Sequence, residues 1–281
     1  MYNMYNMILE ILSKLASESL LSLYPIFVKT IGLPLSLQTW SRCFSYAVIS
    51  GLFIDYSFVF KTLFTYSGIL LSLVTIVHIY TSYKGFALLE SGVAYSIFYL
   101  YPIIILLMSG HKIQSVMFLA LLGAVLLVYD DRRETIVNEK NRSYNTVMGI
   151  TMIGLAAFTE AVIYFLVRDI KTTNNWNHIF ISYFLGALIL SCYFINDIQI
   201  MKLNGRLSMS LGINSLIGLI GYLLRFYAVS RLDTILYASL SYFGIVMSFV
   251  YGVFIGGDSI DLKKVVGALL IIFSNLWLYL L

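Results

Sequence analysis

Two glutamates lie inside long apolar stretches of this sequence, Glu18 near the N-terminus and Glu160 just past the middle. An ionised carboxylate in hydrocarbon costs about 2.5–3.5 kcal/mol even on insertion scales, so both are expected to face a bundle interior or a wet cavity. Two such acids suit a site that exchanges protons or holds a cation. The alternative for Glu18 is structural, because Lys14 precedes it by the spacing of an ion pair within one helix.

Four other ionisable side chains lie in apolar stretches. Arg225 either anchors an anionic or zwitterionic substrate or extends to the membrane surface, as long basic chains readily do. Lys84 holds the matching place in the first half and has the same two options. His78 is either a proton relay or a packing residue with a hydrogen bond. Arg42 is expected to pair with an acid on a neighbouring helix.

The 22 tyrosines divide between cavity lining and the belts at the membrane surfaces. Those expected to line a cavity fall in two apolar stretches: Tyr95, Tyr99, Tyr101, Tyr237 and Tyr242. The predicted substrate- or proton-binding residues are therefore Glu18, Glu160, His78, Tyr95, Tyr99, Tyr242 and Arg225. Other polar residues are expected to be solvated (Glu10, His111, His178) or to cap helices (Glu90, Asp233), where the helix dipole favours an acid.

The composition requires a membrane for these residues to act in. Of the 281 residues, 60% are hydrophobic and 11% are charged, and the mean hydropathy is +0.88. Soluble domains carry about 25% charged residues, so this chain cannot cover a water-facing surface. The net charge of +4 gives no reason to expect nucleic-acid binding. The two cysteines, Cys43 and Cys192, offer neither a metal site nor a disulfide framework, and no cofactor is expected.

The apolar stretches match the roughly 20 residues that a membrane-spanning helix needs. They predict an all-α, polytopic membrane protein with ten transmembrane helices, at about residues 7–31, 37–54, 66–83, 86–109, 113–129, 146–167, 179–195, 211–229, 232–255 and 265–281. Pro25 and Pro102 are expected to kink the first and fourth.

The two halves of the chain end alike, each with a glycine turn followed by an apolar run that carries Gly-Ala (Gly123-Ala124 and Gly267-Ala268). This predicts a first repeat at residues 1–130, a polar linker at 131–145 and a second repeat at 146–281. Two tandem copies of an odd number of helices must insert in opposite orientations, which gives a 5+5 inverted repeat. The Gly-Ala pairs are expected to be packing contacts.

Several of these segments resemble the drug/metabolite transporter superfamily, and within it the EamA-like ten-helix transporters. They are Phe86–Met108 with its proline, Tyr227–Phe254, the turns at Gly110 and Gly257, and Arg42 with Phe44. At the turns, His111 and Asp258 replace the glutamate usual in that family. The resemblance implies the ten-helix fold, a transport function and a cavity formed by the third, fourth, eighth and ninth helices.

A secondary transporter is therefore expected, an exporter or exchanger of a small polar metabolite such as an amino acid, working by alternating access, with proton coupling as an option. No G-x-x-x-x-G-K-[ST] motif is present for ATP drive, and no catalytic cluster suggests an enzyme. A channel or assembly subunit is the alternative. The cell (inner) membrane is the expected location, and a monomer suffices. Basic residues in the turns place the termini outside, whereas the resemblance places them in the cytoplasm.

Overall fold

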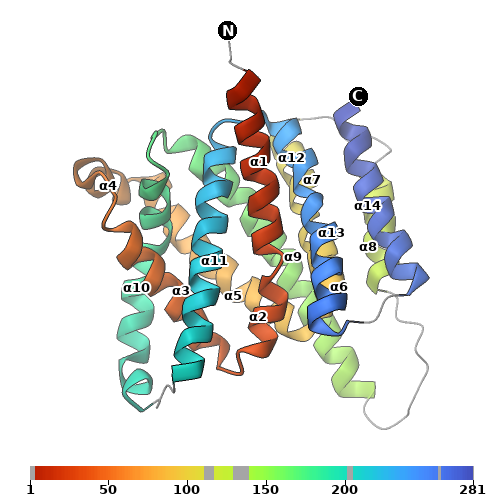
Figure 1. The fold of residues 1–281 in the computed structure, drawn as a ribbon, viewed down its shortest axis with the longest axis horizontal. Coiled ribbons are helices and arrows are strands. Elements are labelled where there is room, and N and C mark those ends of the chain that lie inside the picture. Colours follow the sequence, from red (N-terminus) through yellow and green to blue (C-terminus); the bar gives the residue numbers. More distant parts are fainter. Residues whose placement is uncertain (1–3, 111–116, 129–138, 201–204, 259–260, 281) are drawn as a thin grey trace.

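A computed structural model describes residues 4–110, 117–128, 139–200, 205–258 and 261–280. Every regular element within these ranges is a helix, and the helices form one bundle with its long elements running in the vertical direction of Figure 1. The start of α1 and the end of α14 lie at the same, upper end of the bundle.

The described ranges contain eight helices in the first half of the chain and six, with one π-helical turn, in the second. In the first half they are α1 (Met4–Leu21), α2 (Tyr24–Thr30), α3 (Leu35–Ser50), α4 (Tyr56–Leu63), α5 (Tyr66–Leu88), α6 (Ser91–Phe98), α7 (Tyr101–Met108) and α8 (Met117–Val128). In the second half they are α9 (Glu139–Asp169), α10 (Asn175–Ile200), α11 (Gly205–Val229), α12 (Thr234–Ser241), α13 (Phe243–Tyr251), the π-helical turn η1 (Gly252–Gly256) and α14 (Leu262–Leu280).

Three of the expected spans are broken helices. The chain breaks between α1 and α2 just before Pro25, and between α6 and α7 just before Pro102, so both predicted kinks are present. A proline removes one backbone hydrogen bond and clashes with the preceding turn. The third break, between α12 and α13, falls at Tyr242 without a proline.

Seven segments in the described ranges are long and apolar enough to cross a membrane: Asn6–Thr30, Tyr66–Leu88, Ser91–Met108, Tyr144–Asp169, Asn175–Tyr193, Gly205–Val229 and Thr234–Gly256. The other three expected spans contain the helices α3, α8 and α14. Of these, α3 has 16 residues, or roughly 24 Å at 1.5 Å per residue, which is less than the hydrocarbon core of a bilayer. The described residues therefore support seven membrane-spanning helices, and the expected number of ten remains a prediction.

Two stretches between the expected spans contain helix. The helix α9 already begins at Glu139, within the stretch predicted as a polar linker at 131–145; residues 131–138 lie outside the described ranges. The stretch between the spans expected at 37–54 and 66–83 contains α4, which begins where the Asp55 carboxylate accepts a hydrogen bond from the Phe58 amide. A short polar side chain at this position satisfies a free amide of the first helical turn.

Helices of the two halves pack on one another in matching pairs. The helix α5 of the first half packs along α9 of the second half, and α11 of the second half packs along α1 of the first. The helices α3 and α10 also pack together, as do α8 and α14. At this last contact Gly123 faces Gly267, and a Cβ atom on Gly123 would lie 2.5 Å from the Gly267 carbonyl oxygen. Small residues at these positions let the two backbones approach.

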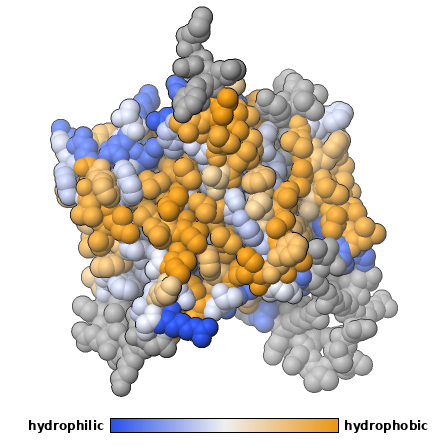
Figure 2. Space-filling view, in the orientation of Figure 1, coloured by the Kyte–Doolittle hydropathy of each residue, from blue (hydrophilic) through white to orange (hydrophobic). Residues whose placement is uncertain are grey.

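The surface of the bundle is apolar over the middle of its helices. Figure 2 shows hydrophobic residues across the face formed by α1, α11 and α13, with hydrophilic patches near the upper and lower ends. Large apolar side chains are exposed on several helices, among them Leu12, Val48, Val77 and Leu188. Such a belt is the surface that lipid chains would cover.

Candidate functional site

Arg225 of α11 joins the two glutamates that the sequence singles out. Its Nη1 donates to Glu160 Oε1 of α9 at 2.6 Å, and its Nη2 donates to Glu18 Oε2 of α1 at 2.9 Å. All three residues are at most 3% exposed. A guanidinium presents donors in a planar fork and can therefore hold two carboxylates at once. The expectation that Arg225 reaches the membrane surface is wrong, because it lies inside the bundle and is held by these pairs.

A shell of polar side chains surrounds the Glu18 carboxylate. Lys14, one turn earlier in α1, forms an ion pair with it, and the Tyr99 hydroxyl donates to its Oε2. The Tyr101 hydroxyl donates to Ser241 Oγ at 2.8 Å and accepts from Lys14 Nζ at 3.2 Å. The local pairing of Lys14 with Glu18 therefore exists, but as one part of a larger network.

The break between α6 and α7 is what brings Tyr99 and Tyr101 to the same carboxylate. In a continuous helix, residues two apart point to nearly opposite sides. Here the helical path is interrupted between Tyr99 and Leu100, and both hydroxyls reach the Glu18 side chain, with Tyr101 at 3.4 Å from Oε1. Pro102 thus contributes to the site through the backbone and not through its own side chain.

His78 of α5 continues the network beyond Glu160. Its Nε2 lies 3.3 Å from Glu160 Oε2 and 3.2 Å from the Tyr222 hydroxyl. Its Nδ1 lies 3.2 Å from both the Ala156 carbonyl oxygen and Thr159 Oγ1. The Thr159 hydroxyl already donates to a carbonyl of its own helix, so Nδ1 faces acceptors and must carry a hydrogen.

Two of the predicted site residues lie beside this network without joining it through a hydroxyl. The Tyr95 ring contacts that of Tyr99, with centroids 5.3 Å apart, but its hydroxyl donates to the Leu21 carbonyl. Tyr242 is buried at the break between α12 and α13, and its hydroxyl has no hydrogen-bond partner among the residues that the structure describes. The structure thus brings Glu18, Glu160, His78, Tyr99 and Arg225 together and leaves these two apart.

Other expectations for charged residues need correction. Glu10 and His178 were expected to be solvated, but both are buried, and His178 lies in α10 against the Phe226 ring. Asp233 caps α12 as predicted, by accepting from the Leu236 amide. Glu90 precedes α6 but makes no capping bond, and it pairs with Lys264 instead. His111 lies outside the described residues, so its expected solvation remains a prediction.

Arg42 was expected to pair with an acid, and this is also wrong. Its Nη2 donates to the Tyr183 hydroxyl at 3.0 Å. Tyrosine rings surround its guanidinium, those of Tyr24 and Tyr222 at 4.7 Å from Cζ and three others within 5.7 Å. Lys84, which holds the place in the first half that matches Arg225, is half-buried in α5.

A cavity of about 620 Å³ opens at the upper end of the bundle in Figure 1, between the starts of α4 and α10 and the ends of α9 and α11. Asp55, Arg168, Lys171 and Asn177 contribute polar groups to its lining. From this cavity a line of side chains leads inward. Arg168 donates to the Tyr164 hydroxyl at 2.5 Å, and the Tyr164 ring contacts that of Tyr237 at 5.0 Å.

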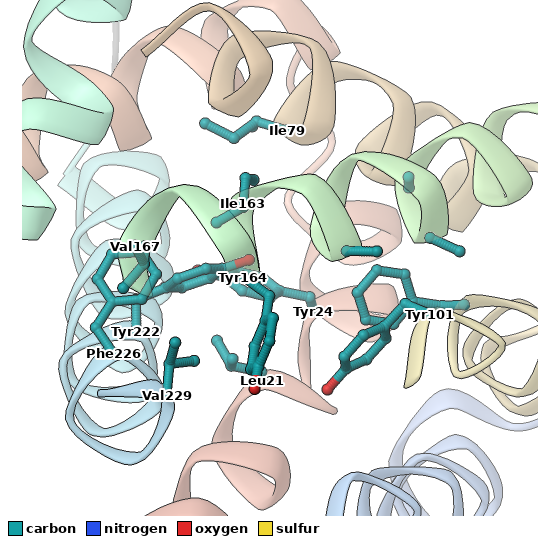
Figure 3. Packing of buried hydrophobic residues seen from close by; sticks show 14 of the residues in the cluster. Leu21, Tyr24, Ile79, Tyr101, Ile163, Tyr164, Val167, Tyr222, Phe226 and Val229 are labelled. Atoms are coloured by element: carbon teal, nitrogen blue, oxygen red, sulfur yellow. The ribbon is translucent and has the colours of Figure 1, made fainter. Parts of the chain in front are cut away.

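The inner end of this line is Lys14, whose Nζ lies 3.6 Å from the centre of the Tyr237 ring. Figure 3 shows how closely this region is filled: Tyr164 and Val167 of α9 lie next to Phe226 of α11, and Tyr101 of α7 lies against α9 farther along. The polar network is thus separated from the cavity by a small number of aromatic side chains.

An ion pair and a hydrogen bond join helices at the opposite end. Asp258, just after η1, accepts from the Ser91 amide at 2.7 Å, and Lys29 lies 3.9 Å from the same carboxylate. Gly257 before it has a φ of +70°, and Gly110 at the corresponding turn has a φ of +80°, a backbone region that glycine enters readily. The two turns predicted from the repeat are therefore turns that require glycine.

From the sequence, only a local role is expected for Lys14, and no role is expected for Tyr222 or Ser241. Lys14 carried a usable signal, because a buried lysine in an apolar stretch must pair with an acid or reach the surface. The position of Tyr222, one turn before Arg225 on α11, was also visible in the sequence. What placed these side chains together is the packing of α1, α5, α9 and α11, which no spacing in the chain encodes.

Together, the helical fold, the membrane-spanning segments and the buried charge network define a multi-pass membrane protein. Residues 147–280 match the model of the EamA-like transporter family. The second half of the chain thus matches the EamA-like transporter family, and the resemblance to the drug/metabolite transporter superfamily is confirmed. The match indicates a membrane transporter of small molecules.

Comparison with solved structures supports the fold. A structure described only as "Crystal structure of protein" superposes with a TM-score of 0.62, over 95% of this chain and 94% of that one, at 16% sequence identity. At this identity the likeness concerns the fold alone. No curated protein matches the sequence.

Proposed function

We propose that this protein is a secondary transporter of a small polar metabolite, such as an amino acid or related compound, in the cell (inner) membrane. It works by alternating access as an exporter or exchanger coupled to protons. The observation that carries the proposal is the joining of Glu18 and Glu160, one from each half of the chain, by Arg225 in the centre of the bundle.

A 5+5 inverted repeat of ten helices is part of this proposal. It is supported by the matching helix pairs, because a two-fold relation that exchanges α1 with α9 and α5 with α11 turns the α5–α9 contact into the α11–α1 contact. The same relation makes α3 pack on α10 and α8 on α14, each on its own counterpart. The match of the family at residues 147–280 supports the proposed second repeat at 146–281.

Proton coupling is supported by the geometry of His78 and Glu160. With a hydrogen on Nδ1, a neutral His78 presents a lone pair at Nε2, and this lone pair faces the Glu160 carboxylate. Two acceptors 3.3 Å apart repel, and one proton between them turns the repulsion into a charge-assisted hydrogen bond. Glu160 Oε2 has no other hydrogen-bond donor among the described side chains. The pair is therefore our proposed proton site.

Substrate would reach this region from the cavity beside Arg168 and leave at the opposite end, or the reverse. In this conformation the cavity is open at one end, whereas the contacts of Asp258 with Lys29 and Ser91 hold the other end closed. Rocking of one repeat against the other would break the contacts of Asp258 and close the cavity beside Arg168, as expected for inverted-repeat transporters.

Reconstitution into liposomes tests the function. Vesicles with purified protein are preloaded with unlabelled amino acids or organic acids, and uptake of the same labelled compound is followed. We expect saturable uptake that the internal compound accelerates, because exchange requires a carrier that alternates. Flux that rises linearly with concentration would indicate a channel, and the absence of flux for the whole panel would contradict the proposal.

A further inference from the structure

Among the residues whose burial is described, two arginines are buried in the bundle, and their surroundings differ. Arg225 lies between two carboxylates. Arg42, in α3, is 2% exposed and forms no ion pair with any described side chain. A buried charge is costly unless an opposite charge or several hydrogen bonds accompany it. Arg42 therefore needs an explanation that the network around Arg225 does not supply.

Tyrosine rings form a box around the Arg42 guanidinium. Its members are Tyr24, Tyr46, Tyr83, Tyr183 and Tyr222, with ring centres 4.7–5.7 Å from Cζ. The faces of aromatic rings attract a cation, which compensates part of the cost of burial. They carry no net negative charge, so the box remains positive.

Two polar groups in the tyrosine box have unused hydrogen-bonding capacity. Arg42 Nε and the Tyr83 hydroxyl are both buried and have no hydrogen-bond partner within the described part of the chain. Most buried polar groups of folded proteins are paired, so two unpaired donors in the same tyrosine box point to an acceptor that arrives from elsewhere. The Tyr24 and Tyr46 hydroxyls, 2.7 Å apart, bond to each other instead.

We infer that the tyrosine box binds the carboxylate of the transported molecule, with Arg42 as its anchor and the tyrosine rings around the rest of the molecule. The inference rests on the proposed transport function and names the class of substrate. A carboxylate fits because its two oxygens match the donor fork of one guanidinium and its single charge balances a single cation. A doubly charged phosphate would leave one charge unpaired there.

Tyr222 connects this box to the proposed proton site. One face of its ring lies 4.7 Å from Arg42 Cζ, its centre is 5.4 Å from Arg225 Cζ, and its hydroxyl reaches His78 Nε2. A carboxylate at Arg42 would displace these rings and so alter the contact of Tyr222 with His78. Substrate binding and proton binding are thereby linked through one side chain, without direct contact between substrate and proton.

Thermal stabilisation of the purified full-length protein tests the inference. Each carboxylate in a panel of amino acids and organic acids is compared with its uncharged carboxamide, and inorganic phosphate forms a separate arm. A ligand that binds the folded state raises the melting temperature. We expect at least one carboxylate to stabilise the wild type while its amide and phosphate do not. If no carboxylate exceeds its amide, or if phosphate alone stabilises, the inference is wrong.

Variants then locate the effect. Arg42→Met should raise the half-stabilising concentration of that carboxylate about 10- to 100-fold, which is the loss of hydrogen bonds to a charged group. Arg42→Lys should raise this concentration less, since it keeps the charge. Arg231→Met, in the loop before α12, should leave the concentration unchanged. Equal stabilisation of Arg42→Met and wild type would overturn the inference. Saturable exchange of only uncharged or cationic compounds would overturn it too, while leaving the transport function intact.

Discussion

At the residue scale, Arg225 holds two carboxylates with one guanidinium, and Lys14 balances the remaining charge. Breaking such a buried arrangement by removing one partner costs about 3–5 kcal/mol, because an uncompensated charge stays behind. The network is therefore expected to matter for folding as well as for transport, and the two roles need separate tests.

Arg225→Met should lower the melting temperature of the purified protein strongly, because Glu18 and Glu160 lose their shared cation. Adding Glu160→Gln to this variant should recover part of the loss, since it removes one of the two uncompensated charges. Arg231→Met serves as the matched control, because Arg231 lies outside the network and contacts Tyr227. If Arg225→Met is no more destabilising than Arg231→Met, the network does not hold the helices together.

The sequence was sufficient to name most of these residues, because a charge inside an apolar stretch stands out. It could not show which of them meet. Arg225 was compatible with the membrane surface until the packing of α11 against α1 and α9 placed it inside. A carboxylate partner is expected for Arg42 because charge pairing is the usual solution, whereas rings from four other helices surround it.

At the element scale, the broken helices and the glycine contacts shape the bundle. The two proline breaks were predictable, since proline interrupts the backbone ladder. The break at Tyr242 has no proline to signal it, and the short helix α4 has only its cap at Asp55, so neither was predicted. The close approach of α8 and α14 was anticipated only as a packing role for the Gly-Ala pairs.

Gly123→Leu should destabilise the protein by about 1–3 kcal/mol, because a side chain there would push α8 away from the Gly267 backbone. Gly154→Leu in α9 is the matched control, since a Cβ atom at Gly154 meets nothing within 4 Å. Melting temperatures in detergent measure both. Equal effects of the two substitutions would mean that the α8–α14 contact is not as close as described.

Asp258→Asn should loosen the closed end of the bundle. We expect Ser91→Cys, introduced after replacement of Cys43 and Cys192, to react several-fold faster with a membrane-impermeant maleimide when Asp258→Asn is also present. Asp233→Asn, at the cap of α12, is the control and should leave the labelling rate unchanged. A labelling rate unaffected by Asp258→Asn would show that this carboxylate does not hold the end closed.

At the scale of the whole molecule, the proposal depends on the two halves acting as counterparts around a central site. Composition alone excluded a soluble protein, and the length of the apolar stretches placed the helices well. The sequence is a weaker guide to the number of membrane crossings than to the positions of the helices, because α3 and the described part of α8 are shorter than a full span. Substrate class depends on side chains from several helices, so only the three-dimensional arrangement raised the question of Arg42.

The most direct measurement of the central claim is uptake of an exchanged substrate into liposomes under an imposed pH gradient. The wild type should accumulate substrate in response to the gradient. Glu160→Gln should still exchange substrate at equal pH but should lose the response to the gradient, because the proposed proton site with His78 is gone. Glu90→Gln, a partly exposed carboxylate at the membrane face, should behave as wild type. Gradient-driven accumulation that survives Glu160→Gln would contradict the account.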